Sequence, residues 1–237
     1  MSVLVLGNQG EIDRARSELR RRGVDCTSWW VTGMLRKYGI LKGINVGDVK
    51  KSWDVLKTVD FIQNNLTLSD PILDIGAYRS EMLPLLKKLG HTDLTGIDLN
   101  DNIGAMPGSD SILYQVADCY QSPFNDNSFA AVSAISVIEH GFDSKRLLDE
   151  LGRIIRPGGY FIASMDYWPD KVDTSGLDAY GMDWKIFSRD DVMEFLNDAE
   201  KVGLRPVGNL SFEADIPLIS WMGKSFTFAW LALQKKY

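Results

Sequence analysis

Three aspartates, Asp74, Asp98 and Asp118, each end a short apolar run of the chain. Ligands of parallel α/β sheets bind beyond the carboxyl ends of the strands, so we expect these carboxylates to face one crevice. A carboxylate at the second strand end can accept hydrogen bonds from both hydroxyls of a ribose, and one at the third from an adenine amino group. An acid at the first strand end would repel a pyrophosphate and suits a positively charged cofactor. The three positions therefore predict a nucleoside site.

Gly76 follows the first of these strand ends and lets the backbone lie close to a ligand. His140 is the histidine expected nearest to the crevice. Its ordinary pKa lies close to physiological pH, which suits a general base that takes a proton from a substrate hydroxyl. The alternative is that His140 only shapes the loop beside the cofactor. Histidine, cysteine and acidic residues lack metal-ligand spacing, so we expect no metal site.

The irregular stretch 166–187 contains aromatic residues interrupted by acids and glycines. This composition is typical of a lid or of a wall of the substrate site, and a packed surface loop is the equally weighted alternative. The candidate substrate residues in it are Tyr167, Trp168, Tyr180 and Trp184.

The segments that position these residues alternate between strand and helix, as βαβ units do. Ser188 is a predicted N-cap, with acids in the first helical turn. The Pro-Gly-Gly sequence at 157–159 is expected to break the chain before a strand. Strands are predicted over 71–74, 94–97, 112–117, 129–138, 160–165, 206–216 and 225–234, and helices over 80–89, 143–155 and 188–202.

The first 69 residues form a separate predicted segment. Val3 to Leu6 has the character of a strand, 12–22 of a helix, and 50–66 of an amphipathic helix. Residues 1–70 contain 11 Lys and Arg against 8 Asp and Glu, whereas the rest of the chain contains 15 against 24. We read the first segment as a helical cap on an acidic α/β domain.

Composition narrows the class of protein without revealing its function. The chain has 237 residues, 45% hydrophobic and 24% charged, and a formal net charge of -6. The acidic main domain argues against a nucleic-acid partner. Apolar runs are too short to span a bilayer, and the start lacks the basic and apolar parts of a signal peptide. Two cysteines make no disulfide framework, so we expect a cytoplasmic protein; the oligomeric state is not indicated.

From about residue 70 to the end, the ordered motifs resemble class I, Rossmann-like S-adenosylmethionine-dependent methyltransferases. Ile72 to Gly76 is similar to the first motif of that family, and Gly96 to Leu99 to its ribose-binding strand end. The similarity continues in Ala117-Asp118, the loop 122–129, Ser136 to His140, and the helix that leads to Gly159. The resemblance implies a three-layer α/β sandwich with a seven-stranded, mostly parallel sheet of order 3-2-1-4-5-7-6, in which strand seven is antiparallel. The domain would cover 70–237, with the cap over 1–69.

The resemblance also implies roles for individual residues. Asp74, Gly76 and Tyr78 would lie near the methionine end of S-adenosylmethionine, Asp98 would bind the ribose and Asp118 the adenine side. Leu99 would pack against the adenine ring, and Ser136 to Ile138 would form the floor of the site. The expected reaction is methyl transfer to an oxygen or nitrogen of a small-molecule acceptor, with S-adenosylhomocysteine as the second product.

The first motif departs from the family pattern, because Tyr78 and Ser80 stand where two further glycines are usual. Ser80 can cap the next helix. Two alternatives to a methyltransferase therefore stay open: a methyltransferase-like binding subunit without catalysis, and a nicotinamide-dependent dehydrogenase. The loop after the first strand of the predicted domain does not contain the G-x-G-x-x-G sequence that a nicotinamide-dependent dehydrogenase would be expected to have.

Overall fold

The computed structural model describes residues 3–28, 31, 34–35, 38, 40 and 43–237. In this part of the chain a nine-stranded sheet forms the centre of the molecule. The parallel strands are β2 (Ile72–Ile75), β3 (Leu94–Asp98), β4 (Leu113–Val116), β5 (Phe129–Ile135) and β6 (Ile155–Tyr167). They are arranged in the order β4-β3-β2-β5-β6, and β11 (Lys224–Lys235) lies antiparallel beside β6. The predicted mostly parallel α/β sandwich is confirmed.

The far edge of the sheet differs from the prediction. The expected strand 206–216 is present only as β9 (Leu204–Pro206), which pairs with one end of β11. The rest of that edge is taken by β1 (Val3–Val5), which pairs antiparallel with Leu231 to Ala229 of β11. The N-terminal segment is therefore not only a helical cap, because its first strand completes the sheet. A short strand β10 (Ile219–Trp221) makes a hairpin with β11.

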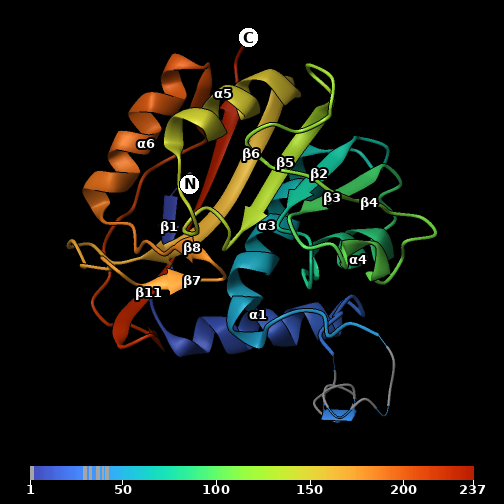
Figure 1. The fold of residues 1–237 in the computed structure, drawn as a ribbon, viewed down its shortest axis with the longest axis horizontal. Coiled ribbons are helices and arrows are strands. Elements are labelled where there is room, and N and C mark those ends of the chain that lie inside the picture. Colours follow the sequence, from blue (N-terminus) through green and yellow to red (C-terminus); the bar gives the residue numbers. More distant parts are fainter. Residues whose placement is uncertain (1–2, 29–30, 32–33, 36–37, 39, 41–42) are drawn as a thin grey trace.

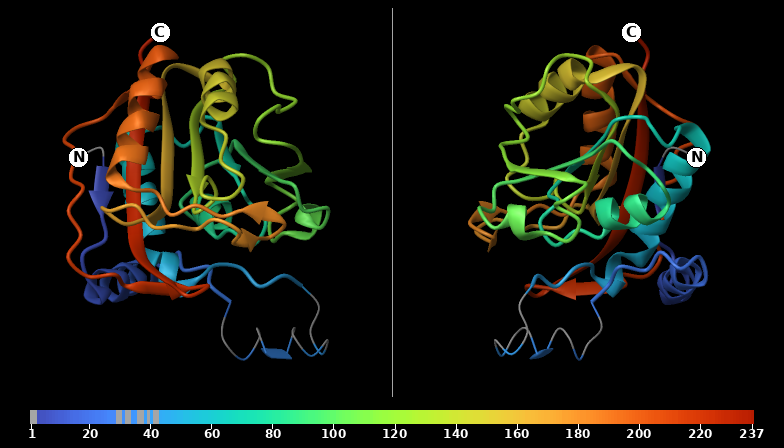
Figure 2. Two further views of the ribbon diagram at one scale, coloured as in Figure 1. Left: turned by 60° about the vertical axis from the view of Figure 1, so that its left-hand side comes forward. Right: turned by 90° about the vertical axis from the view of Figure 1, so that its right-hand side faces the viewer.

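Helices cover both faces of the sheet, as Figures 1 and 2 show. Three helices contribute to the core on one face: α1 (Gln9–Arg21), α3 (Ser52–Asn65) and α4 (Met82–Lys88). A 3₁₀ turn, η1 (Val49–Lys51), comes directly before α3. On the other face lie α5 (Ser144–Ile154) and α6 (Arg189–Lys201). Ser188 and Asp191 form the capping box that starts α6, which confirms the predicted N-cap.

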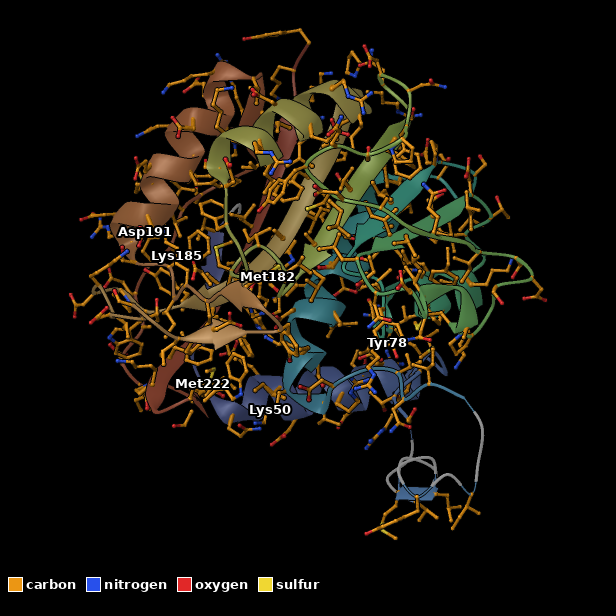
Figure 3. The ribbon with its side chains drawn as sticks, in the orientation of Figure 1. Lys50, Tyr78, Met182, Lys185, Asp191 and Met222 are labelled. Carbon is orange, nitrogen blue, oxygen red and sulfur yellow. The ribbon has the colours of Figure 1, made fainter. Side chains whose placement is uncertain are left out.

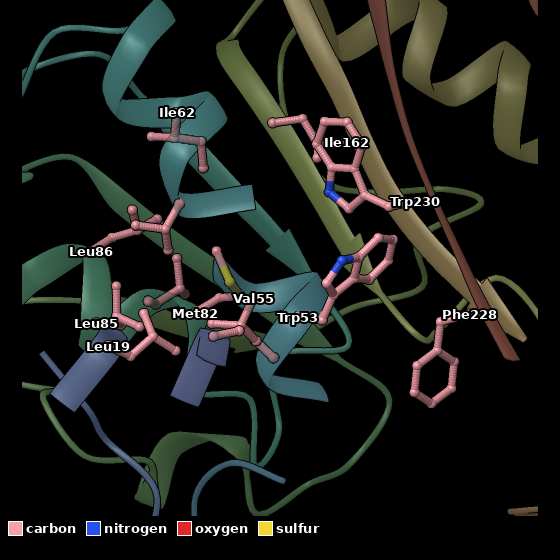
Figure 4. Packing of buried hydrophobic residues seen from close by; sticks show 14 of the residues in the cluster. Leu19, Trp53, Val55, Ile62, Met82, Leu85, Leu86, Ile162, Phe228 and Trp230 are labelled. Carbon is pink, nitrogen blue, oxygen red and sulfur yellow. The ribbon is translucent and has the colours of Figure 1, made fainter. Parts of the chain in front are cut away.

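Alternating side chains of the strands explain the two layers of core. In β6, Ile162 belongs to the cluster under α1, α3 and α4, whereas Phe161 belongs to the cluster under α5 and α6. Figure 4 shows the first cluster, in which Trp53 of α3 lies with Ile162 and Trp230 of the sheet. Residues on both sides of position 69 thus share one hydrophobic core. The boundary between cap and domain at this position stays a prediction.

Two further boundaries differ. The strand predicted over 129–138 ends at Ile135, because Ser136 adopts a left-handed φ of 53° and turns the chain. The Pro-Gly-Gly sequence does not break the chain before a strand: β6 already begins at Ile155, and its register with β5 shifts between Phe129 and Ala131. The glycines are absorbed as an irregularity inside the strand.

The carboxyl ends of the parallel strands point toward α1. In Figures 1 and 2, α1 lies across this end of the sheet, and a hairpin of β7 (Asp178–Ala179) and β8 (Met182–Asp183) lies near the end of β6. Within the described residues no helix is long and apolar enough to cross a membrane. The N-terminal segment and the β7–β8 hairpin therefore border the edge at which a ligand is expected.

Candidate functional site

The loop after β2 is fixed on the end of β3 by backbone hydrogen bonds. Gly76 and Ala77 both donate their N–H groups to the carbonyl of Ile97, at 2.9 and 3.0 Å. Tyr78 donates its N–H to Oδ2 of Asp98 at 3.0 Å. Gly76 has a φ of 74°, which L side chains rarely adopt. This φ explains why a glycine is favoured here, and the expectation that Gly76 lets the backbone lie close to a ligand stays a prediction.

Asp74 faces the interior. Its side chain is 1% exposed, and its two oxygens accept hydrogen bonds from the hydroxyls of Ser133 and Ser80, at 2.6 and 2.8 Å. Burial raises the pKa of Asp74 to about 7. The serine that replaces a family glycine thus ties the loop to the strand through Asp74. In this structure Asp74 positions the loop.

Asp98 and Asp118 lie at neighbouring strand ends, with more access to solvent. Oδ1 of Asp98 accepts the N–H of Asn100 at 2.9 Å, so both of its oxygens already hold backbone groups and keep further lone pairs for a ligand. Asp118 is partly exposed and lies 3.5 Å from the guanidinium of Arg146. The side chain of Leu99 is 62% exposed beside them. The structure brings these three predicted nucleoside residues to one edge of the sheet.

The turn after β5 closes over Gly76. The N–H of Ser136 donates to the carbonyl of Ser164 at 3.0 Å. A Cβ at Gly76 would lie 2.3 Å from Cγ2 of Val137, so the valine side chain fills the space that the glycine leaves. Ile138 is 5% exposed and belongs to the core under α5 and α6. The predicted floor residues 136–138 are therefore next to the loop, and their exposed element is the Ser136–Val137 turn.

His140 lies under an aromatic group from two hairpins. Its ring meets Tyr180 edge-on at 5.3 Å between ring centroids, and Trp221 at 6.4 Å. Burial and the charge of Lys51 lower the pKa of His140 to about 4, so the imidazole is neutral at pH 7. Its Nδ1 is buried without a hydrogen-bond partner in the described part of the chain. A neutral ring nitrogen of this kind can hold or accept a proton from a ligand.

The four predicted substrate residues separate into two groups. Trp184 is 2% exposed and donates its Nε1–H to Asp166 at 2.9 Å, and Tyr180 lies near it at the tip of the β7–β8 hairpin, 82% exposed. Trp168 packs against the same core as Trp184. Tyr167 is fully buried in the core of the opposite face, where its hydroxyl donates to the carbonyl of Phe212 at 2.7 Å. The alternation of β6 therefore turns Tyr167 away from the others.

Charged groups from several elements lie close together beside His140, and the sequence did not predict that they meet. Lys51 of η1 donates to the hydroxyl of Ser136, and its Nζ lies 3.7 Å from Oδ1 of Asp166. Asp54 of α3 is buried and accepts the Ser164 hydroxyl at 2.7 Å. Glu139 is 1% exposed. Polar residues on the buried face of the amphipathic helix 50–66 were the available signal. In Figure 3, Lys50, next to Lys51, is labelled on the same side of the molecule as Met182 and Met222 of the two hairpins.

The N-terminal segment is also joined to the first-motif loop by an ion pair. Arg16 of α1 makes two hydrogen bonds to Glu81, at 2.9 and 2.5 Å, and Glu81 immediately precedes α4. Both side chains are at most 3% exposed. Among the described residues no three acidic, histidine or cysteine side chains are close enough together to hold a metal ion.

Comparison with known proteins gives a family model and several solved structures. Residues 73–163 match the model described as a methyltransferase domain. A curated relative, 27-O-demethylrifamycin SV methyltransferase of Amycolatopsis mediterranei, is 28% identical over 40% of this chain and 38% of its own length. The chain thus matches about two fifths of that relative.

Proteins with different activities have solved structures that resemble this fold. Geranyl diphosphate C-methyltransferase from Streptomyces coelicolor, bound to S-adenosyl-L-homocysteine, superposes with a TM-score of 0.60 at 14% identity, covering 97% of this chain and 99% of that one. The [4+2]-cyclase SpnF superposes with a TM-score of 0.56 at 13% identity, covering 80% and 84%. At these identities the similarity establishes the fold, and the reaction has to be argued from the site.

Proposed function

Because residues 73–163 match the methyltransferase-domain model and the fold is that of class I methyltransferases, we propose that this protein transfers a methyl group from S-adenosylmethionine to a small-molecule acceptor. The observation that carries the proposal is the arrangement around Asp98. Its carboxylate holds the loop that begins at Gly76, and Asp118 lies at the next strand end. A ribose and an adenine amino group need acceptors at two such neighbouring positions.

The residues present fit the cofactor at its nucleoside end. We assign Asp98 to the ribose hydroxyls, Asp118 to the adenine amino group and exposed Leu99 to the adenine ring. At the methionine end, Gly76, Tyr78 and the Ser136–Val137 turn would surround the cofactor.

The cofactor supplies an activated methyl group on a sulfonium. The protein's contribution is to hold the acceptor in line with it and to exclude water. The hairpin that contains Tyr180 and Trp184 covers the region beside His140, and the neutral imidazole can accept a proton if the acceptor carries one. We also propose that the acceptor is not a nucleic acid and that the protein is located in the cytoplasm.

One observation favours the non-catalytic alternative, a methyltransferase-like binding subunit. Val137 fills the space at Gly76, and the contact between Lys51 and Ser136 closes the same region. If this closure is permanent, the methionine end of the cofactor has no room. The dehydrogenase alternative gains no such support, since the loop after β2 lacks the glycines of a dinucleotide site.

Isothermal titration calorimetry separates the three functions. We expect S-adenosylmethionine and S-adenosylhomocysteine to bind at one site per chain, and NAD not to bind. Binding of NAD alone would refute the methyltransferase proposal. Binding of none of the three would favour the non-catalytic subunit.

A further inference from the structure

Three carboxyl groups from three different elements are buried around Lys51. They are Asp54 of α3, Glu139 after β5 and Asp166 of β6, exposed by 0, 1 and 4%. Burial raises the pKa of all three carboxyl groups, and the charge of Asp166 adds to this for Asp54 and Glu139, while the charge of Lys51 opposes the rise in each. The three carboxyl groups and the ammonium therefore act as one electrostatic unit, which we call the carboxyl cluster.

The hydrogen bonds of the carboxyl cluster are incomplete. Asp166 has Trp184 and Lys51 as partners, and Asp54 has Ser164. Oδ1 of Asp54 and Oε2 of Glu139, however, are buried without a hydrogen-bond partner among the described residues. A buried carboxylate that lacks a partner is costly, so burial favours the protonated form of these groups unless further positive charge lies beside them. The arrangement is thus suited to a second positive charge.

Lys51 shows that an ammonium group fits this environment. Its Nζ lies 3.4 Å from the centroid of the Phe228 ring and 3.7 Å from the carboxylate of Asp166. An aromatic face on one side and a carboxylate on the other are the contacts that protein sites offer to ammonium ligands. The side chain of the protein itself is a stand-in for such a ligand.

Aromatic rings extend from this position to the surface. Trp184, whose Nε1–H bonds to Asp166, meets Trp221 edge-on at 4.8 Å between centroids. Trp221 in turn stacks with Tyr180 at 6.3 Å, and these two side chains are 37% and 82% exposed. The two exposed rings come from the β7–β8 and β10–β11 hairpins. A continuous series of ring contacts therefore leads from the surface to Asp166.

We propose that the carboxyl cluster and the aromatic rings of Trp184, Trp221 and Tyr180 bind the positively charged amino group of the methyl acceptor, which makes the acceptor an amine. The inference rests on the proposed methyltransferase function and narrows the acceptor from oxygen or nitrogen to nitrogen. The bound ammonium transfers one proton to the Glu139 carboxylate, so for an amine acceptor Glu139 takes the place of His140 as the proton acceptor. The acceptor is then a neutral amine with a free lone pair, and Glu139 is a neutral carboxyl group.

The probe is choline, compared with its uncharged isostere 3,3-dimethyl-1-butanol, each titrated into the full chain by calorimetry. We expect choline to bind at least about tenfold more tightly, because only the charged compound gains from the rings and carboxylates. Equal affinities would refute a cation site. Choline has to bind equally well to protein saturated with S-adenosylhomocysteine. Competition between the two would mean that the cluster holds the amino group of the cofactor, and would overturn the acceptor assignment.

Glu139→Gln tests the residue on which the proton transfer depends. Burial and the charges of Asp166 and Asp54 raise the pKa of Glu139, and the charge of Lys51 opposes this rise. His140, the next residue in the chain, is neutral. Binding of a cation must therefore ionise Glu139 and release a proton, which calorimetry detects as a binding enthalpy that differs between phosphate and Tris buffers. We expect choline affinity to rise with pH in the natural protein and the proton release to disappear in Glu139→Gln.

The expected loss of choline affinity in Glu139→Gln is about tenfold, with the affinity for S-adenosylhomocysteine changed by less than about threefold. Asp183→Asn, the same change of charge at an exposed site on β8, is the matched control and should leave choline binding unaltered. Equal effects of the two substitutions, or proton release that persists in Glu139→Gln, would overturn the proposal. Failure of S-adenosylmethionine to bind would refute the proposed function instead, and leaves the choline comparison valid.

Discussion

Replacing Arg16 by alanine should destabilise the whole protein and loosen the first-motif loop. The Arg16 guanidinium bonds to both oxygens of Glu81, to Ser52 at 2.9 Å and to Asp25 at 3.0 Å. Without it, the Glu81 carboxylate, whose side chain is 1% exposed, stays buried with no opposite charge. Removing one partner of such a buried pair costs about 3–5 kcal/mol.

For a chain of this length each kcal/mol lowers the melting temperature by about 2–4 °C, so we expect a fall of about 10 °C in thermal unfolding followed by circular dichroism. Arg20→Ala is the control, because its pair with the same Asp25 is largely exposed on the arginine side and should contribute less than about 1 kcal/mol. The double substitution of Arg16 by Met and Glu81 by Leu removes both charges and should recover most of the loss.

Glu81 lies between α4 and the loop after β2, in which Tyr78 donates its N–H to Asp98. Since we assign this loop and Asp98 to the cofactor site, Arg16→Ala should also weaken the binding of S-adenosylhomocysteine. Equal melting temperatures of Arg16→Ala and Arg20→Ala would refute the view that this pair fastens the N-terminal segment to the domain. A double variant as unstable as Arg16→Ala would show that the buried charge of Glu81 is not the cause.

Three other substitutions test single residues in and around the loop that follows β2. Asp98→Ala should raise the dissociation constant of S-adenosylmethionine about 10- to 150-fold, the effect of about 1.5–3 kcal/mol from lost charge-assisted hydrogen bonds, whereas Asp101→Ala at an exposed position should not raise it. Equal dissociation constants for the two variants would show that the ribose lies elsewhere. Folding raises the pKa of Asp74, so the natural protein loses stability as the pH rises from about 4 to 7 and the unfolded state ionises first. Asp74→Asn does not titrate and should therefore gain stability relative to the natural protein over that range, by about 4 kcal/mol at most in urea unfolding. Parallel curves of unfolding free energy against pH for the two proteins would contradict this. Gly76→Ala should destabilise by about 2 kcal/mol in chemical unfolding, because of its φ of 74° and the lack of space for a Cβ, while Gly104→Ala, with open space, should be near neutral; similar losses would argue against strain.

Local patterns in the sequence were enough to predict much of the domain. The strand order from β4 to β11 and the helix begun by Ser188 follow from short apolar runs, turn residues and a cap, together with a family resemblance. Asp98 and Asp118, the two acids that we assign to the nucleoside, lie at adjacent strand ends, as expected from the parallel pairing of β3 and β4. These features depend on neighbours along the chain or on a known topology.

The features that sequence reasoning missed depend on contacts between distant residues. Asp54 and Ser164 are 110 positions apart, and nothing in the periodicity of either segment indicates that they bond. The pairing of β1 with β11 joins segments from the two ends of the chain. Because β1 occupies most of this edge of the sheet, the strand expected over 206–216 is replaced by the short strand β9 (Leu204–Pro206). Tyr167 was grouped with its neighbours by composition, whereas the pleat of β6 places it on the other face.

The most direct test of the account is mass spectrometry of a reaction that contains the protein, S-adenosylmethionine and a panel of small amines and alcohols. The account predicts that S-adenosylhomocysteine forms and that an amine gains one methyl group, with both products much reduced for Asp98→Ala. Binding of S-adenosylmethionine without formation of either product would contradict catalysis, and a methylated alcohol without any methylated amine would contradict the role of the carboxyl cluster.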